Sequence, residues 1–519
     1  MAKRVLIVGA GPGGLAASML LAKAGLDVTM LERLPRVGGR TSTIESQGFH
    51  FDVGPTFFLY PQILAEIFAA AGHDLYREVE LVRLDPQYRL VFGSGGELLA
   101  TPDTARMQAA MAELSPQDAR ALPRFLDDNR TKLERFKPCL ESPFVGWRDI
   151  VTPQLLRLLP LLRPWRSLDR ELKTYFTDPR IRLAFSFQSK YLGMSPFQCP
   201  SLFSILSFLE YAYGVFHPIG GCGAITESMA RIATSLGVDI RLNEPVEQLL
   251  FEGRRIVGAQ TDAGAYRADA TILNADFAQA MTHLVPDHLR RRWRDRKLER
   301  KRYSCSTMML YLGLDGCDSD IPHHTIYLSK DYVNNLADIE TRHVLSDDPS
   351  FYVQNASVAD ATLAPAGMST LYVLIPVTHQ HPNVNWQQEA QRYRSLVLRQ
   401  LSKIGLSDVE RRIRFEHMMT PADWEYSYAL YRGSTFSLAH NLRQMLHLRP
   451  RNRFEDLDAT YLVGGGTHPG SGLPVIFESA RITSRLLLND LGLPSQWIDD
   501  VGRDGQPFNP VEIFEDALA

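Results

Sequence analysis

A short run of glycines near the start of the chain has the spacing of a nucleotide-binding loop. The segment Gly9-Ala10-Gly11-Pro12-Gly13-Gly14 matches the pattern G-x-G-x-x-G. Gly9 allows a tight turn, Gly11 lets the backbone approach a pyrophosphate, and Gly14 lets a helix pack closely on a strand. Gly13 belongs to the same loop, and the helix that follows offers free N–H groups to phosphate oxygens. The chemistry predicted here is binding of a dinucleotide.

A carboxylate follows the glycine run at the spacing that such a site requires. Glu32 stands about 20 residues further on, directly after the aliphatic stretch 27–31. Its oxygens can accept hydrogen bonds from a ribose 2′-hydroxyl and would repel a 2′-phosphate. We include the neighbouring Arg33 among the candidate cofactor contacts.

Two further glycine-rich segments favour FAD over NAD. The first, Val37-Gly38-Gly39-Arg40-Thr41, lets the chain pass close to a diphosphate, and Arg40 adds positive charge beside Gly39. The second is the run 464–470, of sequence GGGTHPG, just before the last predicted helix. A second loop and helix N-terminus is more than NAD requires and suits a long cofactor with a ribityl chain.

The elements that position these loops are an N-terminal βαβ unit and distant strands. The aliphatic run 5–8 predicts a buried parallel strand, 14–24 a helix and 27–31 a second strand. Strands return between 237 and 275, and a last strand is expected at 461–463, followed by a helix near 475–491. We therefore predict an α/β protein in which a discontinuous Rossmann-type FAD-binding domain (1–92, 214–300 and 451–519) joins an α+β substrate domain (93–213 and 301–450). That second domain would include a helical, membrane-contacting part, and the ligand would bind in the cleft between the two domains.

The overall composition excludes several other classes of protein. Lys plus Arg is 56 and Asp plus Glu is 59, a net charge of −3, which gives no general attraction to nucleic acid. The five cysteines are odd in number and form no C-x-x-C pair, so neither a disulfide framework nor a zinc ribbon is expected. His323-His324, His379 and His381 have no carboxylate at ligand-like spacing, and we predict no metal site.

The glycine segments in their context resemble the flavin-containing amine-oxidase-like superfamily and, more narrowly, the bacterial-type carotenoid (phytoene and diapophytoene) desaturases. The matching segments include VLIVGAGPGGLAAS, ERLPRVGGRTST, GFHFDVGPTFFLYP, GVFHPIGGCGAITESMARI, LNADFA and YLVGGGTHPGSGLP. The resemblance implies FAD, a long C30 or C40 polyene substrate and attachment to membranes. It also implies that the backbone of Val246 lies near the adenine, and that the flavin ribityl and pyrophosphate groups lie near Gly465, Gly466 and Thr467.

One segment departs from the phytoene desaturase pattern. Val475-Ile476-Phe477-Glu478 stands where many of those enzymes continue with Gly-Val. It resembles relatives that act on C30 chains or on carotenoids that are already desaturated. We therefore list Val475 among the cofactor contacts and leave the substrate chain length open.

Desaturation removes a hydride and a proton from adjacent carbons, and this chemistry points to residues of the second domain. Flavin can accept the hydride, whereas the proton needs a base or a route to solvent. Asp178 and Arg182, four residues apart, are candidates that could pair on a helix starting near Pro179, with Asp178 as its N-cap. Glu210 is the other candidate, because apolar surroundings would raise its pKa. An apolar channel would fit the aromatic residues Phe185, Phe187, Tyr191, Phe197, Phe203, Phe208, Tyr211, Tyr213 and Phe216. The alternative is hydrophobic core, which we expect for more than half of them.

Two segments are candidates for contact with a membrane surface. The leucine- and arginine-rich run 153–168 is too short and too charged to span, but it could insert shallowly; the alternative is a buried core helix. The basic run 290–302 could bind anionic lipid with Trp293 at the interface; the alternative is a solvated charged helix. We expect a peripheral, monotopic protein at the cytoplasmic face of the membrane, with self-association left open.

Together these features predict an FAD-dependent oxidoreductase that desaturates an acyclic C30 or C40 carotenoid precursor. Oxygen or a quinone would reoxidise the flavin. One alternative keeps the fold but oxidises a terminal methyl group, or isomerises or saturates a double bond. A non-enzymatic alternative is a prenyl-binding protein resembling the GDP-dissociation inhibitors, and an amine or amino-acid oxidase is a third.

Overall fold

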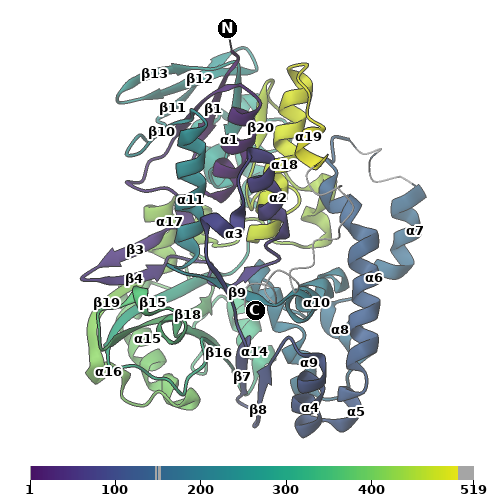
Figure 1. The fold of residues 1–519 in the computed structure, drawn as a ribbon, viewed down its shortest axis with the longest axis vertical. Helices are drawn as coiled ribbons and strands as arrows, with labels where there is room; N and C mark the ends of the chain where they lie inside the picture. Colours follow the sequence, from purple (N-terminus) through teal and green to yellow (C-terminus); the bar gives the residue numbers. More distant parts are fainter. Residues whose placement is uncertain (1, 147–148, 150–152, 501–519) are drawn as a thin grey trace.

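A parallel sheet of five strands forms the upper part of the molecule (Figure 1). The computed structural model describes residues 2–146, 149 and 153–500. The strand order is β10-β2-β1-β14-β20. The five strands are β1 (Arg4–Val8), β2 (Asp27–Leu31), β10 (Asp239–Arg241), β14 (Ala270–Leu273) and β20 (Thr460–Leu462).

The strand register aligns the carboxyl ends of segments that lie far apart in the chain. Val8 of β1 pairs with Leu31 of β2 and with Leu273 of β14, and Leu273 pairs with Leu462 of β20. The predicted strands at 5–8, 27–31 and 461–463 are confirmed to within one residue. The loops that leave these four strands therefore meet at one edge of the sheet, where α/β proteins bind their ligands.

Helices cover both the sheet and its edge. The glycine-opened helix α1 (Pro12–Lys23) packs between α11 (Cys222–Ser235) and α18 (Leu473–Asp490), and buried aliphatic residues of all three join one hydrophobic core. Against these lie α2 (Gln62–Ala71), α3 (Leu75–Glu78) and α19 (Trp497–Asp500). An antiparallel meander of β11 (Gln248–Glu252), β12 (Arg255–Thr261) and β13 (Gly264–Arg267) is attached at the other side.

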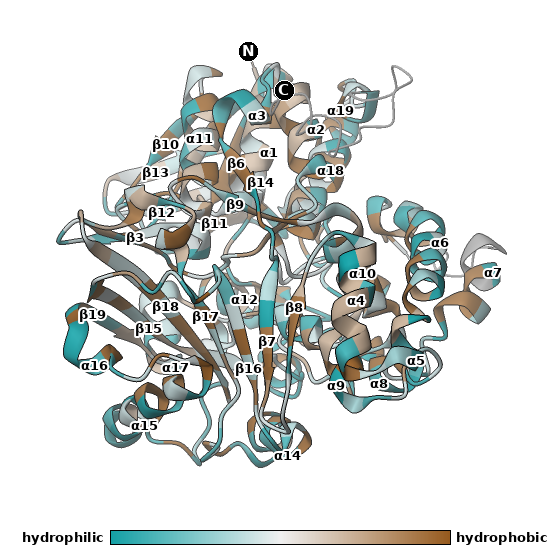
Figure 2. Cartoon of the chain, turned by 60° about the horizontal axis from the view of Figure 1, so that its bottom comes forward, coloured by the Kyte–Doolittle hydropathy of each residue, from teal (hydrophilic) through white to brown (hydrophobic). Residues whose placement is uncertain are grey.

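A second, mixed sheet of seven strands builds the lower part of the molecule (Figure 2). Its strand order is β19-β15-β18-β17-β16-β7-β8. The predicted division placed 88–92 in the nucleotide-binding domain, and in the structure this strand pairs with residues 325–328 of the seven-stranded sheet. The strands are β7 (Tyr88–Phe92), β8 (Glu97–Ala100), β15 (Ser306–Asp315), β16 (His324–Leu328), β17 (Phe351–Gln354), β18 (Met368–Val377) and β19 (Ile413–Met419).

Helices flank this second sheet, and small sheets join it to the first. Buried residues of α15 (Trp386–Gln400) share a hydrophobic core with β15 and β18. The linking strands are β3 (Thr43–Ser46), β4 (Phe49–Asp52), β5 (Phe58–Leu59), β6 (Leu81–Arg83) and β9 (Val215–Pro218). The other helices are α4 (Thr104–Leu114), α5 (Pro116–Ala119), α6 (Leu122–Glu141), α7 (Pro153–Leu162), α8 (Leu168–Leu172), α9 (Pro179–Ala184), α10 (Ser204–Tyr213), α12 (Phe277–Leu284), α13 (Asp295–Glu299), α14 (Tyr332–Ala337), α16 (Val409–Arg412) and α17 (Pro421–Tyr428).

The leucine- and arginine-rich segment forms helix α7 at the outer edge of the helical part (Figure 1). Leu158 and Leu162 are buried against α6 and α10, whereas Leu159 is 37% exposed and Trp165, just beyond the helix, is 64% exposed. The segment therefore has one packed face and one apolar face open to its surroundings. Among the described residues no helix is long and apolar enough to cross a membrane.

The basic segment differs from the prediction at its aromatic residue. Trp293 is 1% exposed, its ring packs edge-on against Phe277 at 4.9 Å, and its Nε1–H donates to the Glu455 carboxylate at 3.0 Å. Arg290 is equally buried and pairs with Asp295. The prediction that Trp293 lies at a membrane interface is wrong, because its indole packs inside the protein and its N–H is hydrogen-bonded there.

Candidate functional site

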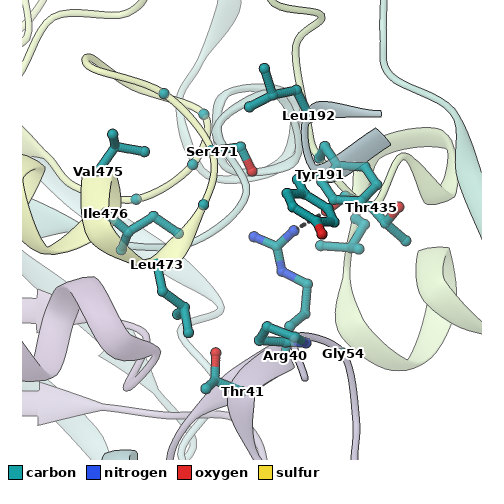
Figure 3. Close-up of a pocket in the computed structure, with 18 of the residues that line it drawn as sticks. Arg40, Thr41, Gly54, Tyr191, Leu192, Thr435, Ser471, Leu473, Val475 and Ile476 are labelled. Carbon is teal, nitrogen blue, oxygen red and sulfur yellow. Dashed lines mark hydrogen bonds between the residues drawn. The ribbon is translucent and has the colours of Figure 1, made fainter. Parts of the chain in front are cut away.

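A cavity of about 670 Å³ lies between the carboxyl edge of the parallel sheet and the seven-stranded sheet. One part of its wall is glycine loops, and the other is mostly apolar side chains from α6, α10, α14 and the second sheet. The close-up in Figure 3 shows Arg40 and Thr41 facing the loop that carries Ser471 and Leu473. The cavity therefore joins the predicted cofactor residues to a large apolar space.

Glu32 lies where β2 ends, and the backbone holds its carboxylate in place. Its oxygens accept hydrogen bonds from the N–H of Ala10 at 2.7 Å and of Leu34 at 2.9 Å. Burial raises the pKa of this carboxyl, and these two backbone hydrogen bonds act in the opposite direction. The carboxylate lines the cavity at the position where a ribose hydroxyl is expected.

Asn274, which follows β14, is a site residue that the sequence analysis did not single out. Its side-chain Nδ2–H donates to the carbonyl of Gly9 at 2.9 Å and to that of Gly11 at 3.4 Å, so it holds the glycine loop in shape. The signal was present in the sequence, because an asparagine directly after a buried parallel strand lies at the ligand-binding edge.

The glycines of the first loop divide into two roles. A Cβ on Gly14 would lie 2.5 Å from the Gly9 carbonyl oxygen, and one on Gly13 would lie 2.4 Å from a methyl group of Val463. These two positions need glycine for packing. Gly11 faces the cavity, and a Cβ on Gly39 of the second segment would lie 3.6 Å from the Gly11 Cα, so the two glycine strips are neighbours.

The remaining predicted cofactor contacts fall mostly on the cavity wall. Gly465, Gly466, Val475, Val246 and Arg33 line it, as do Gly9, Gly13 and Arg40. Gly14 and Thr467 do not, and the Thr467 hydroxyl is buried and donates to the Pro450 carbonyl at 2.6 Å. The Arg40 guanidinium donates to the Thr435 carbonyl across the cavity, as Figure 3 shows, and burial lowers its pKa.

Two helices begin at the cavity without a side-chain cap. Gly11 precedes α1 and Gly472 precedes α18; neither glycine has a side chain that could cap the helix, and both residues line the cavity. The backbone N–H groups of both first turns are therefore open to a ligand, with the positive end of each helix dipole behind them. Together with Glu32 and the glycine segments around Gly11 and Gly39, the two helix N-termini fit a long dinucleotide that carries a diphosphate.

Comparison with known proteins agrees with that fit. The family described as flavin containing amine oxidoreductase matches residues 12–488, nearly the whole described chain. The chain belongs to this flavin-containing amine oxidoreductase family. The prediction of FAD is confirmed, and the residues that would hold it are those of the glycine loops, Glu32 and Arg40. When bound, FAD supplies an acceptor for two electrons and a hydride.

Relatives within this family narrow the resemblance. The chain is 43% identical to a 4,4'-diapophytoene desaturase (4,4'-diapolycopene-forming) from a Methylomonas species, over 93% of this chain and 95% of that protein. It is 40% identical to an all-trans-zeta-carotene desaturase from Myxococcus xanthus, with 94% of each chain covered. A solved oxidoreductase from Methanosarcina mazei has the same fold, with a TM-score of 0.60 at 17% identity, covering 92% of this chain and 98% of that one. The predicted resemblance to carotenoid desaturases is confirmed.

In this family member the apolar wall of the cavity comes from several separate elements. Leu133 and Phe136 of α6 and Leu206 of α10 line it, as do Leu336 of α14 and Ile339 just after that helix. Of the nine predicted channel aromatics, only Phe187, Tyr191 and Phe203 line it. The others pack elsewhere, as Phe185 does in the core with Phe125 and Phe176.

Glu210 is fully buried beside the cavity, in a cluster of phenols and amides. Its Oε2 accepts hydrogen bonds from Tyr88 at 3.0 Å and from Gln188 at 2.8 Å. Burial raises its pKa to about 7, although Gln188, Tyr191 and Tyr88 favour the ionised form. The raised pKa is as expected. Glu210 does not itself line the cavity, and Tyr191 is the member of the cluster that does.

Asp178 and Arg182 lie in the helical part, outside the cavity wall. Asp178 caps α9, as expected, by accepting the N–H of Arg180 at 2.7 Å. The expected pairing with Arg182 is wrong: Asp178 pairs with Arg180 at 2.7 Å and Arg182 with Asp169 at 3.5 Å. The Asp178 carboxylate is taken up by the cap and by Arg180, and the Arg182 guanidinium donates to the carbonyl of Phe176 at 3.4 Å.

Proposed function

We propose that the chain is an FAD-dependent desaturase of an acyclic C30 or C40 carotenoid precursor. The observation that carries this proposal is one continuous cavity with a dinucleotide cradle at one side and an apolar space at the other. An unactivated hydrocarbon has no polar group that could form a hydrogen bond, so only shape and apolar contact can orient it. The names of the two desaturases to which the chain is most similar among those described support the same reading.

The apolar residues of the cavity wall would hold the polyene and keep water away from it. Ile326 of β16 and Leu374 of β18, which lie on either side of β17 in the second sheet, and Leu206 of α10 line the space beside the loops. Such walls would keep a polyene extended, with successive carbons available to the cofactor side of the cavity. Each step leaves a proton on the protein, and the apolar walls cannot take it.

The decisive experiment offers the purified, flavin-containing protein phytoene, diapophytoene and lycopene in liposomes. Desaturation predicts products two mass units lighter per step, with absorbance bands at longer wavelength. Products that gain oxygen would contradict desaturation and favour oxidation of a terminal methyl group. Unchanged mass with a shifted spectrum would instead favour isomerisation, and bound lipid without any turnover would favour the prenyl-binding alternative.

We further propose that the protein works as a peripheral, monotopic protein at the cytoplasmic face of the membrane. The exposed face of α7 supports this, because Leu159 and the nearby Trp165 present apolar surface beside Arg163 and Arg166. Flotation with liposomes tests it: Leu159→Ser with Trp165→Ser should reduce recovery with lipid. Tyr426→Ser, at a side chain 77% exposed elsewhere, is the matched control. Equal recovery of all three proteins contradicts the assignment of this face.

The electron acceptor and the basic segment are part of the same proposal. Oxygen or a quinone would reoxidise the flavin, and oxygen uptake compared with quinone reduction during turnover distinguishes them. Arg291, Arg294 and Arg300 are exposed and would bind anionic lipid. Equal flotation with neutral and anionic liposomes would contradict that role. Self-association is a further proposal, tested by light scattering of the purified protein.

A further inference from the structure

A row of buried hydroxyl and imidazole groups leads away from the cavity through the second sheet. At the cavity wall the Tyr352 hydroxyl lies 2.8 Å from the Thr56 hydroxyl and 2.8 Å from His324 Nδ1. His324 Nδ1 in turn lies 3.3 Å from His323 Nδ1. None of these groups was assigned a role by the sequence analysis, and none binds the cofactor loops.

The row continues to Asp360, a buried carboxylate that is bonded to an exposed residue. The His323 ring lies 4.7 Å from the His217 ring, and His217 Nε2 lies 3.1 Å from Asp360 Oδ2. The second nitrogen of His323 (Nε2) and that of His217 (Nδ1) are both buried and have no partner among the described residues. No direct hydrogen bond joins His323 to His217, and at this gap each of the two rings has a nitrogen without a partner among the described residues. Thr362, an exposed residue, donates to the other oxygen of Asp360 at 2.6 Å.

We propose that this row, Tyr352–His324–His323–His217–Asp360, carries the proton released by desaturation from the cavity to solvent. The inference rests on the proposed function, because only removal of two hydrogens from adjacent carbons leaves a proton to be exported. It gives a role to two adjacent buried nitrogens, His323 Nε2 and His217 Nδ1, that have no hydrogen-bond partner among the described residues.

The step balances in atoms and electrons. Bound FAD would accept the hydride from one substrate carbon, and the electron pair of the neighbouring C–H bond becomes the new π bond as that bond breaks. The proton goes to the Tyr352 oxygen as the hydroxyl proton of Tyr352 moves to His324 Nδ1. The proton passes from His324 Nδ1 to His323 Nδ1, the proton of His323 Nε2 moves to His217 Nδ1, and that of His217 Nε2 leaves beside Asp360. Tyr352 and His324 are then restored, whereas His323 and His217 return to their first tautomers before the next cycle.

The charge states of the row suit this transfer. Burial holds the pKa of His323 and of His324 well below the ordinary value, so each ring is neutral and keeps one donor and one acceptor nitrogen. Burial acts to raise the pKa of Asp360, but hydrogen bonds from His217, Thr362 and Gly220 hold it below the usual range. The ionised carboxylate can therefore stabilise a proton arriving on His217. A second carboxyl, Asp52, faces the same ring, and burial raises its pKa to about 6.

Packing fixes the entrance of the row in one orientation. The Phe57 ring stacks on His324 at 4.0 Å with an interplanar angle of 13°, and Phe57 also lines the cavity. Phe57 lies 5.3 Å from Tyr191 as well, so it separates this row from the Glu210 cluster. Two candidate proton acceptors, the row that begins at Tyr352 and the Glu210 cluster, therefore lie on either side of the Phe57 ring.

The test measures proton release directly. Flavin-containing wild type, Tyr352→Phe, His324→Gln and Glu210→Gln are mixed with substrate in liposomes without oxygen, in weak buffer with a pH indicator. Flavin absorbance reports hydride transfer and the indicator reports the proton in bulk water. We expect Tyr352→Phe and His324→Gln to slow proton release about tenfold or more, with flavin content and Tm unchanged. His379→Gln, a partly buried histidine outside the row, is the matched control.

Each outcome decides the proposal. Proton release at the wild-type rate in both Tyr352→Phe and His324→Gln overturns the relay, as does its loss in Glu210→Gln alone. If either variant contains less flavin or has a lower Tm than wild type, Asp360→Asn at the far end of the row provides the same measurement. A wild-type protein that forms no desaturated product overturns the proposed function, and the relay with it.

Discussion

The carbonyl oxygen of Gly9 lies 2.5 Å from the point that a Cβ on Gly14 would occupy. The first turn of α1 therefore packs directly on the end of β1, and the Asn274 amide, which donates to the same carbonyl at 2.9 Å, would lie 2.7 Å from that Cβ. The contact explains why two glycines of one motif should respond differently to the same substitution.

Gly14→Ala should destabilise the fold, whereas Gly11→Ala should weaken FAD binding and leave the fold intact. The added methyl group on Gly14 meets backbone that cannot move without opening the βα turn. On Gly11 its nearest neighbour is the Asn274 amide at 3.2 Å, on the cavity wall. We expect a Tm several degrees lower for Gly14→Ala, and FAD affinity about tenfold lower for Gly11→Ala, equivalent to ~1.4 kcal/mol. Equal Tm and equal flavin content in both variants would contradict this division.

Glu210→Gln should become relatively more stable as the pH rises. The folded-state pKa of Glu210 is raised from 4.5 to about 7, so its protonated form contributes stability that is complete below pH 4.5 and is lost as the pH rises through 7. A glutamine stays neutral throughout. The free energy of unfolding of Glu210→Gln relative to wild type should therefore increase by roughly 3 kcal/mol between pH 4.5 and pH 8.

Thermal unfolding of both proteins across this pH range is the measurement. A difference in Tm that stays constant with pH would show that Glu210 titrates in its ordinary range. Asp127→Asn, at a side chain 71% exposed, serves as the control for removal of a carboxylate.

A bulky residue at the α14 end of the cavity should exclude long chains first. Leu336 is 2% exposed and lines the cavity, whereas Val333 of the same helix is 57% exposed on the outside. Leu336→Trp should therefore reduce turnover of a C40 chain more than that of a C30 chain, with FAD content unchanged. Competition between the two substrates, followed by mass spectrometry, measures the change in preference. Val333→Trp should leave this preference as in wild type, and an equal shift in both variants would contradict the assignment of the cavity end.

Asp178 should matter for stability more than for turnover. It caps α9 and pairs with Arg180, and it does not line the cavity. Asp178→Ala should cost about 1 kcal/mol of stability, and Asp178→Asn, which can still cap, should cost less. Turnover per bound flavin should stay near that of wild type in both. A loss of turnover in Asp178→Asn at unchanged Tm would instead give this carboxylate a part in the chemistry.

Local pattern was sufficient for the cofactor half of the site. The βαβ unit, the three glycine segments and Glu32 were all predictable, because a phosphate-binding turn imposes strict requirements on a few neighbouring residues. The role of Asn274 was less visible, since it depends on β14 lying beside β1 although some 265 residues separate Asn274 from Gly9.

The substrate half depended on contacts between distant segments. Trp293 was predicted to lie at a membrane interface, and Arg182 was predicted to pair with Asp178 four residues away. In the fold Trp293 bonds to Glu455 and Arg182 pairs with Asp169. Most of the aromatic run predicted as channel is core, because a buried aromatic residue looks the same in sequence whether it faces a cavity or another side chain.

By itself the sequence determined the cofactor and the βαβ unit that binds it, since these rest on local spacing that backbone geometry makes obligatory, and it determined the family through the resemblance of whole segments. Only the tertiary structure decided where the apolar cavity runs and which titratable groups stand beside it. Tyr352 and His324 lie on different strands, and His217 and Asp360 come from segments 143 residues apart. Their meeting depends on sheet pairing and packing between distant parts of the chain, which no local pattern specifies.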